Sequence, residues 1–141
     1  MPLTVTAPHG VLTASGRHQI IPLLSAAAIE VSGATGNDFF TPIVGGHVQI
    51  VEPGDVYAGG STRPLVVVRL DLPNIGLGTV ELRAAFIKAA TEIVQQCAVP
   101  WHDPANTWVN IFNAPDGGWG VGGRAYPGDD LIAEITAAAQ R

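Results

Sequence analysis

Charged residues are scarce in this sequence. They make up 13% of its 141 residues, whereas apolar residues make up 47%. About a quarter of an average soluble protein is charged. The length predicts a single domain over residues 1–141, and a domain of this size leaves much of its surface outside its own core. A surface with so little charge predicts that other subunits cover part of it.

Basic residues are rarer still, with 7 Lys and Arg against 12 Asp and Glu and a formal net charge of -5. No basic stripe exists to neutralise phosphates, so we expect no nucleic-acid partner. The one cysteine, Cys97, excludes a disulfide framework and suits a reducing compartment. The histidines lack the spacing of metal ligands, so we expect no metal and no cofactor.

Long apolar runs are also absent. The uncharged run at residues 19–29 is too short to span a bilayer and contains Pro22. The first residues lack the basic and apolar segments of a signal peptide. The sequence therefore predicts a cytoplasmic protein without a membrane partner.

What the sequence does contain is an internal repeat. Residues 2–60 begin with PLTVTA and end in a Gly-Gly pair, and residues 64–123 begin with PLVVVR and end in another. Aligning the two Pro-Leu starts places Val48-Gln49-Ile50 opposite Val109-Asn110-Ile111. Residues 124–141 remain as a C-terminal tail. Two copies of a strand–helix–strand unit are predicted.

Each copy contains a helical pattern between two strands. Residues 82–97 carry apolar residues at helical spacing, with Thr79 as N-cap, and the matching helix spans about 13–31 with a kink at Pro22. Strands are expected near 2–7, 47–51, 65–68 and 108–112. These patterns predict an α/β (α+β) fold with one four-stranded sheet, mainly parallel within each unit. Right-handed crossovers place both helices on one face. The other face is expected to be apolar and covered by partner subunits.

This organisation resembles the tautomerase superfamily. The resemblance rests on Met-Pro-Leu at the start, two βαβ units and a Gly-rich stretch after the last strand. Its tandem members include macrophage migration inhibitory factor, the cis-3-chloroacrylic acid dehalogenases and malonate semialdehyde decarboxylase. The resemblance implies a homotrimer, a small carboxylic-acid substrate and catalysis by an N-terminal proline without a cofactor.

Pro2 is the leading catalytic candidate. Removal of Met1 would leave a secondary amine, and an apolar pocket would lower its pKa towards or below neutral so that it acts as base and acid. The alternative is a proline that only begins an edge strand.

Arg69 and Asp38 complete the catalytic candidates. Arg69 lies in an apolar run, where a guanidinium needs an anion such as a substrate carboxylate or, alternatively, Asp71. Malonate semialdehyde decarboxylase has a second arginine where this sequence has Asp71, which disfavours decarboxylation. Asp38 resembles the catalytic aspartate of that decarboxylase, although Asn-Asp pairs also occur in ordinary turns.

Four further residues are candidates for substrate binding. His47 and Trp108 begin equivalent strands, and Trp108 and Asn110 match residues that line the pocket of macrophage migration inhibitory factor from a neighbouring subunit. Trp119 resembles the aromatic wall that follows the last strand in this family. Pockets of this kind combine apolar walls with few polar groups. Ordinary packing is the alternative for the tryptophans, and a polar position on a sheet face is the alternative for His47.

The sequence thus predicts a cofactor-independent isomerase that interconverts the keto and enol forms of a small keto or unsaturated carboxylic acid. Two alternatives stay open. One is decarboxylase-like or dehalogenase/hydratase-like chemistry, and the other is an inactive trimer that serves as a binding protein.

Overall fold

A computed structural model describes residues 1–141. Its main sheet has four strands in the order β2-β1-β5-β6. Their bounds are β1 Pro2–Pro8, β2 Gly45–Val51, β5 Val66–Leu72 and β6 Thr107–Asn113. β1 and β2 are parallel, β5 and β6 are parallel, and the two pairs meet through antiparallel β1 and β5. The predicted pair of βαβ units is confirmed.

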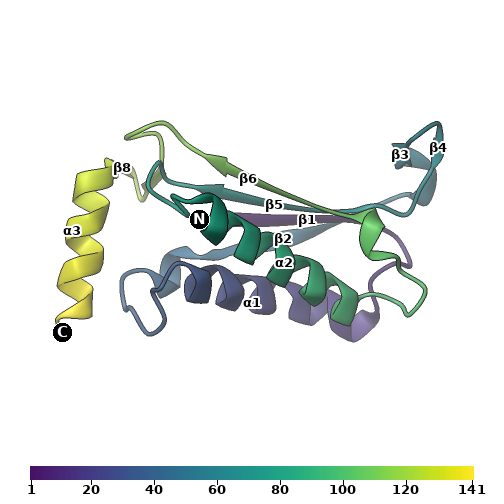
Figure 1. Ribbon diagram of the computed structural model, residues 1–141, viewed down its shortest axis with the longest axis horizontal. Helices are drawn as coiled ribbons and strands as arrows, with labels where there is room; N and C mark the ends of the chain where they lie inside the picture. The colour runs from purple at the N-terminus through teal and green to yellow at the C-terminus, as the bar shows by residue number, and fades with distance from the viewer.

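Two helices, α1 (Ala14–Val31) and α2 (Val80–Cys97), cover one face of this sheet (Figure 1). The hydroxyl of Thr79 accepts a hydrogen bond from the Leu82 amide, which confirms the predicted N-cap. Thr13 caps α1 in the same way, and α1 continues through Pro22 without a break. None of the helices is both long enough and apolar enough to cross a membrane.

The core lies between this helical layer and the sheet. Alternate residues of β1 and β5 point into it, and α1 and α2 each contribute one buried stripe. The fully buried large side chains include Leu3, Val5, Ile20, Leu24, Val66, Val68, Leu70, Phe86 and Val94. Burying such side chains stabilises a fold by about 1.5–3 kcal/mol each. Leu82, expected on this stripe, instead lies at its exposed end.

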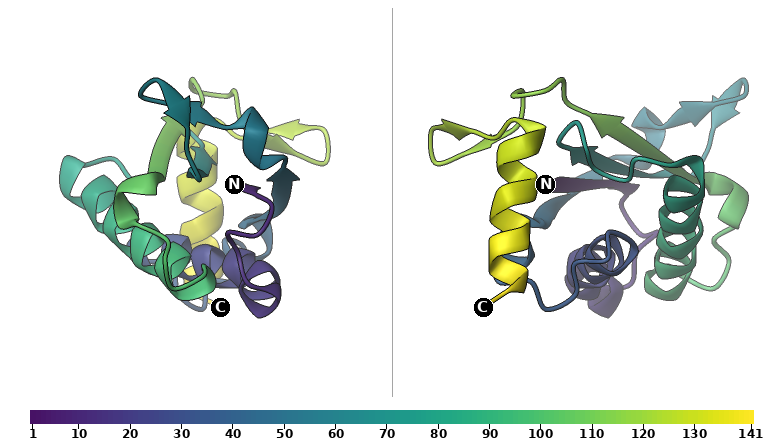
Figure 2. Two further views of the ribbon diagram at one scale, coloured as in Figure 1. Left: turned by 90° about the vertical axis from the view of Figure 1, so that its right-hand side faces the viewer. Right: turned by 60° about the vertical axis from the view of Figure 1, so that its left-hand side comes forward.

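Two short hairpins project from opposite ends of the sheet (Figure 2). One joins β3 (Tyr57–Ala58) to β4 (Ser61–Thr62), and the other joins β7 (Gly120–Val121) to β8 (Arg124–Ala125). Each turns on a Gly-Gly pair with nearly the same positive φ angles, 62° and 88° in the first and 62° and 86° in the second. Such angles favour glycine, so the repeat extends to backbone conformation.

A third helix, α3 (Gly128–Ala139), stands across the end of the sheet at which β1 begins (Figure 1). The sequence interpretation left residues 124–141 as a tail and did not anticipate it. Three single-turn 3-10 helices, η1 (Thr41–Ile43), η2 (Pro53–Asp55) and η3 (Pro104–Asn106), complete the fold.

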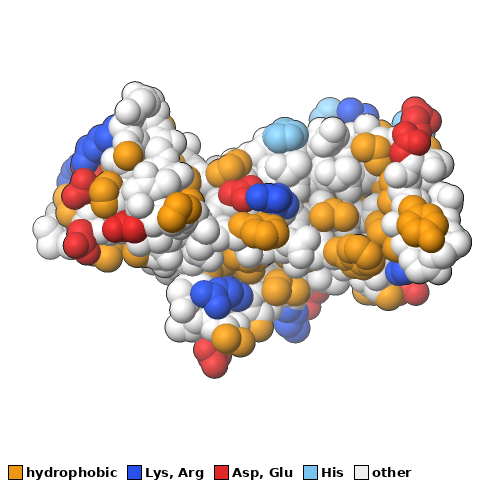
Figure 3. Space-filling model, turned by 90° about the horizontal axis from the view of Figure 1, so that it is seen from above, with side chains coloured by type: hydrophobic (Ala, Val, Ile, Leu, Met, Phe, Trp, Pro, Cys, Tyr) orange, Lys and Arg blue, Asp and Glu red, His pale blue; other side chains and the backbone are white.

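The sheet face away from α1 and α2 was predicted to be apolar, but it carries polar and charged side chains as well. Thr4, Thr6, Arg69, Asp71 and Asn110 occupy its middle, and the large apolar side chains on it are those of β6. The apolar runs of the sequence had suggested burial on both faces, but only one residue in two faces the helices. Seen from this side, basic and acidic side chains adjoin hydrophobic ones near the middle of the molecule (Figure 3).

Candidate active site

Strand pairing brings several predicted site residues into one row on the exposed sheet face. Thr4 of β1 pairs with His47 of β2 and with Arg69 of β5, and Arg69 pairs with Asn110 of β6. Paired residues point to the same face, and adjacent strands lie about 4.8 Å apart. Three residues far apart in sequence, His47, Arg69 and Asn110, thus share a face.

Pro2 and Trp108 lie on the same face, in the rows on either side. Pro2 is two residues before Thr4, and continuing the Leu3–Leu70 pairing by one step places Pro2 opposite Asp71. Trp108 pairs with Val67, two residues before Arg69, and is 43% exposed. Successive rows are about 6.8 Å apart.

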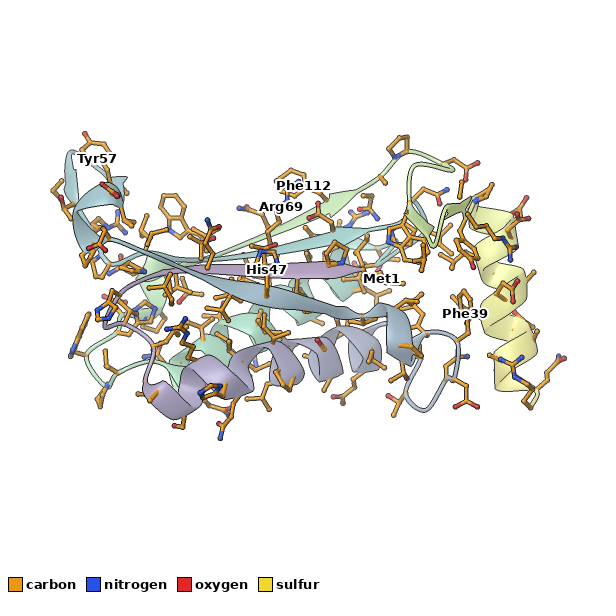
Figure 4. All side chains as sticks on the ribbon, turned by 180° about the vertical axis from the view of Figure 1, so that it is seen from behind. Met1, Phe39, His47, Tyr57, Arg69 and Phe112 are labelled. Carbon is orange, nitrogen blue, oxygen red and sulfur yellow. The ribbon has the colours of Figure 1, made fainter.

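Arg69 is held in a fixed position. Its Nε donates to both carboxylate oxygens of Asp71 at 3.1 and 3.0 Å, and its Nη2 donates to Asp71 Oδ1 at 3.0 Å. Its guanidinium carbon lies 4.2 Å from the centre of the Phe112 ring. Both side chains stand on the sheet face away from the helices (Figure 4). The hydrogen bond and charge of Asp71 raise the pKa of Arg69, so the site carries a permanent cation with a paired anion.

The start of β1 is enclosed. Met1 is only 6% exposed, its amino group donates to the Ile43 carbonyl, and its carbonyl accepts from the Gly45 amide at 3.3 Å. Burial lowers the pKa of the Met1 amino group from 8.0 to about 6, because leaving water disfavours the charged form. Burial at this end of the sheet therefore favours the neutral form of the Met1 amine.

A cavity of about 170 Å³ adjoins Met1. Its walls come from the end of α1, the η1 region, the β5–α2 loop, the first turn of α2 and one side of α3. The apolar residues that line it are Met1, Phe40, Ile75, Leu77, Leu82, Leu131 and Ile135. Leu77 adopts a φ of 44°, a left-handed conformation that bulky residues rarely take. In this conformation the buried Leu77 side chain lines the cavity.

α3 is held over this cavity at its start and near its middle. At its start, a Cβ on Gly128 would lie 2.8 Å from Ile75 Cγ2, so any other residue would require the β5–α2 loop side chains to shift. The Gly128 amide donates to Asp116 Oδ1 at 2.7 Å. Further along, the Ile135 carbonyl accepts from Asn37 Nδ2 at 2.9 Å. These contacts place Leu131 and Ile135 of α3 in the wall of the cavity.

Asp38 and Trp119 lie apart from the row that contains Arg69. Asp38 is exposed beside the end of α3, on the rim of a second hollow that Met1 does not line. Its neighbour Asn37 makes the turn, because Asn37 Oδ1 accepts from the amides of Phe39 and Phe40 at 3.1 and 2.9 Å. Trp119 is 8% exposed and packs against Tyr126, with 5.5 Å between the ring centres. In the single chain it is therefore a packing residue and not part of the exposed row.

Nothing in the structure forms a metal cluster. No group of three or more His, Cys, Asp or Glu side chains is placed to hold an ion. The candidate functional features are an enclosed amine position, an apolar cavity beside it, and the guanidinium of Arg69 on the sheet face away from the helices, where it does not line the cavity.

Comparison with solved structures identifies the fold. A wild-type fused 4-OT, solved as a symmetric trimer, superposes with a TM-score of 0.75 over 94% of this chain and 98% of its own, at 23% identity. The chain has the tautomerase fold. Macrophage migration inhibitory factor of Toxoplasma gondii gives 0.67 over 89% of this chain and 100% of its own, at 14% identity.

Malonate semialdehyde decarboxylase has the tautomerase fold as well, with a TM-score of 0.65 over 99% of this chain and 98% of its own, at 16% identity. No protein-family model matches the chain, and no curated protein matches it in sequence. The comparisons therefore establish the tautomerase fold over nearly the whole chain.

The residues that line the cavity of this tautomerase fold were not predicted from the sequence. Phe40, Ile75 and Leu77 lie in irregular segments without periodicity. Leu131 and Ile135 do carry a signal, since a spacing of four residues places both on one side of a helix. That signal would have indicated α3 as a packed element.

Proposed function

We propose that this chain is a cofactor-independent tautomerase in which Pro2, freed by removal of Met1, is the catalytic base and acid. The observation that carries the proposal is the enclosure of the chain start, where Met1 is 6% exposed and lines an apolar cavity; the same burial lowers the pKa of the Met1 amino group to about 6. Removing Met1 shifts the terminal amine by one residue, to the Pro2 nitrogen. It also vacates the space that the buried Met1 side chain occupies beside the cavity.

The chemistry follows from a neutral secondary amine in apolar surroundings. The Pro2 nitrogen takes a proton from the carbon next to the substrate carbonyl, and the electrons of that C–H bond form an enolate. The protonated amine then returns the proton to the enolate oxygen, which gives the enol. The reverse order converts enol to ketone. A group that exchanges one proton in this way works best with a pKa near the working pH.

Arg69 provides the cation that a small carboxylic acid needs. It lies on the same sheet face as Pro2 and one row away, and a guanidinium binds carboxylates with directed hydrogen bonds. His47, Trp108 and Asn110 supply further polar and aromatic surface on that face. Asp38 lies apart from these residues. We propose that it does not contact the substrate and that it affects the site only as part of the loop between α1 and β2.

We also propose a homotrimer with the exposed sheet faces turned towards its centre. Trp108 and Phe112 are large, apolar and 43% and 48% exposed on this face, which favours their burial by another copy. The fused 4-OT with the same fold is a symmetric trimer. In such an assembly β6 of one subunit would cover the start of β1 in the next.

The test begins with the mass of the intact protein, which shows whether Met1 has been removed. The processed protein is expected to tautomerise phenylenolpyruvate or 2-hydroxymuconate. Pro2→Ala should lower the rate by about 10²–10⁴, the range of general acid–base catalysis, while the circular dichroism spectrum stays unchanged. Protein that retains Met1 should be as inactive as this variant, because its Pro2 nitrogen is an amide.

Full activity of Pro2→Ala would leave Pro2 as the start of a strand and the chain as a binding protein. Malonate semialdehyde provides the second assay, and we expect little or no release of carbon dioxide. Asp71 places a carboxylate next to the only cation of the row that contains Arg69. Efficient decarboxylation without tautomerisation would make the chain a decarboxylase and contradict the proposed tautomerase function.

A further inference from the structure

We propose that Asp71 is the specificity-determining residue of the site and restricts it to monocarboxylates. The proposal rests on the proposed function, because it concerns the acid that Arg69 would bind. It follows from which atoms of Arg69 are already engaged.

Asp71 occupies one edge of the guanidinium. A guanidinium has five N–H groups in a planar fork, and Asp71 takes the edge formed by Nε and Nη2. The Phe112 ring covers one face of the same group at 4.2 Å. The edge formed by Nη1 and Nη2 has no partner within the chain, and it has the geometry for one further carboxylate.

The charges of Arg69 and Asp71 balance each other before a ligand binds. One substrate carboxylate can bind the Nη1–Nη2 edge, and it brings the net charge of the cluster to -1. A second carboxylate on the substrate would add another negative charge with no cation to meet it. His47 is the nearest other basic side chain in the row, two strands and about 10 Å from Arg69.

The position of Asp71 makes the repulsion specific to this site. Continued strand pairing puts Asp71 opposite Pro2, so a substrate that reaches both the Pro2 amine and Arg69 passes beside the Asp71 carboxylate. The side chains of Arg69 and Asp71 are 52% and 35% exposed in the single chain, so no other part of the same chain blocks a ligand. The acid expected here carries one carboxylate and an apolar or aromatic remainder that suits the exposed rings of Trp108 and Phe112 on the same face.

The experiment compares phenylenolpyruvate, with one carboxylate, and 2-hydroxymuconate, with two. The ratio of their kcat/KM values is measured for the parent protein, Asp71→Asn and Glu92→Gln. Asn keeps the shape of Asp71 and an acceptor for Arg69 but removes its charge. Glu92→Gln breaks the exposed Lys88–Glu92 pair on α2 and makes the same change in net charge away from the sheet.

We expect the parent protein to favour phenylenolpyruvate. Asp71→Asn should shift the ratio towards 2-hydroxymuconate by about tenfold, because it removes a like charge a few ångströms from the second carboxylate. Glu92→Gln should leave the ratio unchanged. An unchanged ratio in Asp71→Asn, or equal losses with both substrates, would overturn the proposal and leave Asp71 as a support for Arg69.

A separate binding measurement keeps the two proposals distinguishable. Cinnamate and muconate are titrated into the same three proteins by calorimetry. If no protein is active, the proposed function fails, but the preference for cinnamate and its loss in Asp71→Asn still test the role of Asp71. Equal binding of both acids by the parent protein would refute the inference whatever the activity.

Discussion

The side chain of Asn37 joins the loop after α1 to α3, which lies about a hundred residues further along the chain. Its Nδ2 donates to the Ile135 carbonyl at 2.9 Å, while its Oδ1 accepts from the amides of Phe39 and Phe40. Asn37 is buried, and the cavity next to Met1 lies between the two segments that it connects.

Replacing Asn37 should therefore loosen one wall of the cavity. Asn37→Ala removes three hydrogen bonds and leaves buried groups unpaired, which should lower the free energy of unfolding by about 2–4 kcal/mol. Asn37→Asp keeps the acceptors for Phe39 and Phe40 but turns an oxygen towards the Ile135 carbonyl. It should weaken the attachment of α3 while retaining the turn.

Chemical denaturation of both variants, together with hydrogen exchange of the α3 amides, checks this expectation. Faster exchange confined to α3 in Asn37→Asp is the expected signature. Full protection of α3 in that variant would show that Gly128 and Leu131 hold the helix without Asn37.

Arg69→Ala should weaken substrate binding more than it slows the chemical step. Hydrogen bonds to charged groups are worth about 1.5–3 kcal/mol, so KM should rise about 10- to 100-fold while kcat falls much less. Arg69→Lys keeps the charge but not the planar fork and should give an intermediate KM. Steady-state kinetics with phenylenolpyruvate measure both constants, and a loss confined to kcat would assign Arg69 to the transition state instead.

The pH dependence of kcat/KM should reveal a terminal amine with a pKa below its ordinary value. The amino group of Met1 has its pKa lowered to about 6 by burial, and the Pro2 amine would occupy the adjoining position. Enolisation requires the neutral amine, so the rate should rise with pH through this pKa and reach a plateau near neutrality. An apparent pKa at or above 8 would show that the terminal amine is exposed to water, and it would contradict the expected effect of burial.

His102 predicts a loss of stability in mild acid. It is buried, its Nε2 lies 2.8 Å from the Thr107 hydroxyl, and its Nδ1 has no partner. Burial lowers the pKa of His102 from 6.5, against a smaller opposite effect of the Asp103 charge. Below pH 6.5 the unfolded chain therefore takes up a proton that the folded chain resists, and stability falls with pH until the folded-state pKa is passed.

Thermal unfolding between pH 7.5 and pH 5 measures this effect. His102→Gln should be less stable at pH 7.5 but should lose less stability on acidification than the parent protein. His9→Gln alters an exposed histidine and serves as the control. A parent-like acid response in His102→Gln would place the responsible group elsewhere.

The proposed trimer can be tested on the exposed sheet face. Phe112→Asp puts a charge at a 48% exposed position of β6, and Ile87→Asp puts one at a 40% exposed position of α2. Light scattering should give a trimer mass for the parent protein and for Ile87→Asp, and a smaller mass for Phe112→Asp. A monomer mass for the parent protein would exclude the assembly.

Much of the fold could be predicted from the sequence, because helix caps, hydrophobic periodicity and the internal repeat all indicate the same strands and helices. Thr79 marks the start of α2, and the repeated Pro-Leu starts mark β1 and β5, so the chain order of strands and helices follows from the sequence. α3 was missed because the Gly-rich segment before it suggested a loose tail. Its short apolar pattern at Leu131 and Ile135 had no partner that the sequence could identify.

The site was only partly predictable for a related reason. Residues on strands, such as His47, Arg69 and Asn110, come together through a register that the repeat already implies. The cavity instead depends on irregular backbone, including the left-handed Leu77, and on contacts such as Gly128 with Ile75. Such contacts between distant loops leave no periodic pattern in the sequence.

The duplicated architecture has a stoichiometric consequence. Pro64 stands at the beginning of the second unit as Pro2 does at the beginning of the first, but its nitrogen is joined to the Arg63 carbonyl and cannot become an amine. Under the proposed function, covalent linkage of two equivalent halves leaves one catalytic amine for every two units. The proposed trimer would then have six equivalent strand starts, of which only three could exchange a proton.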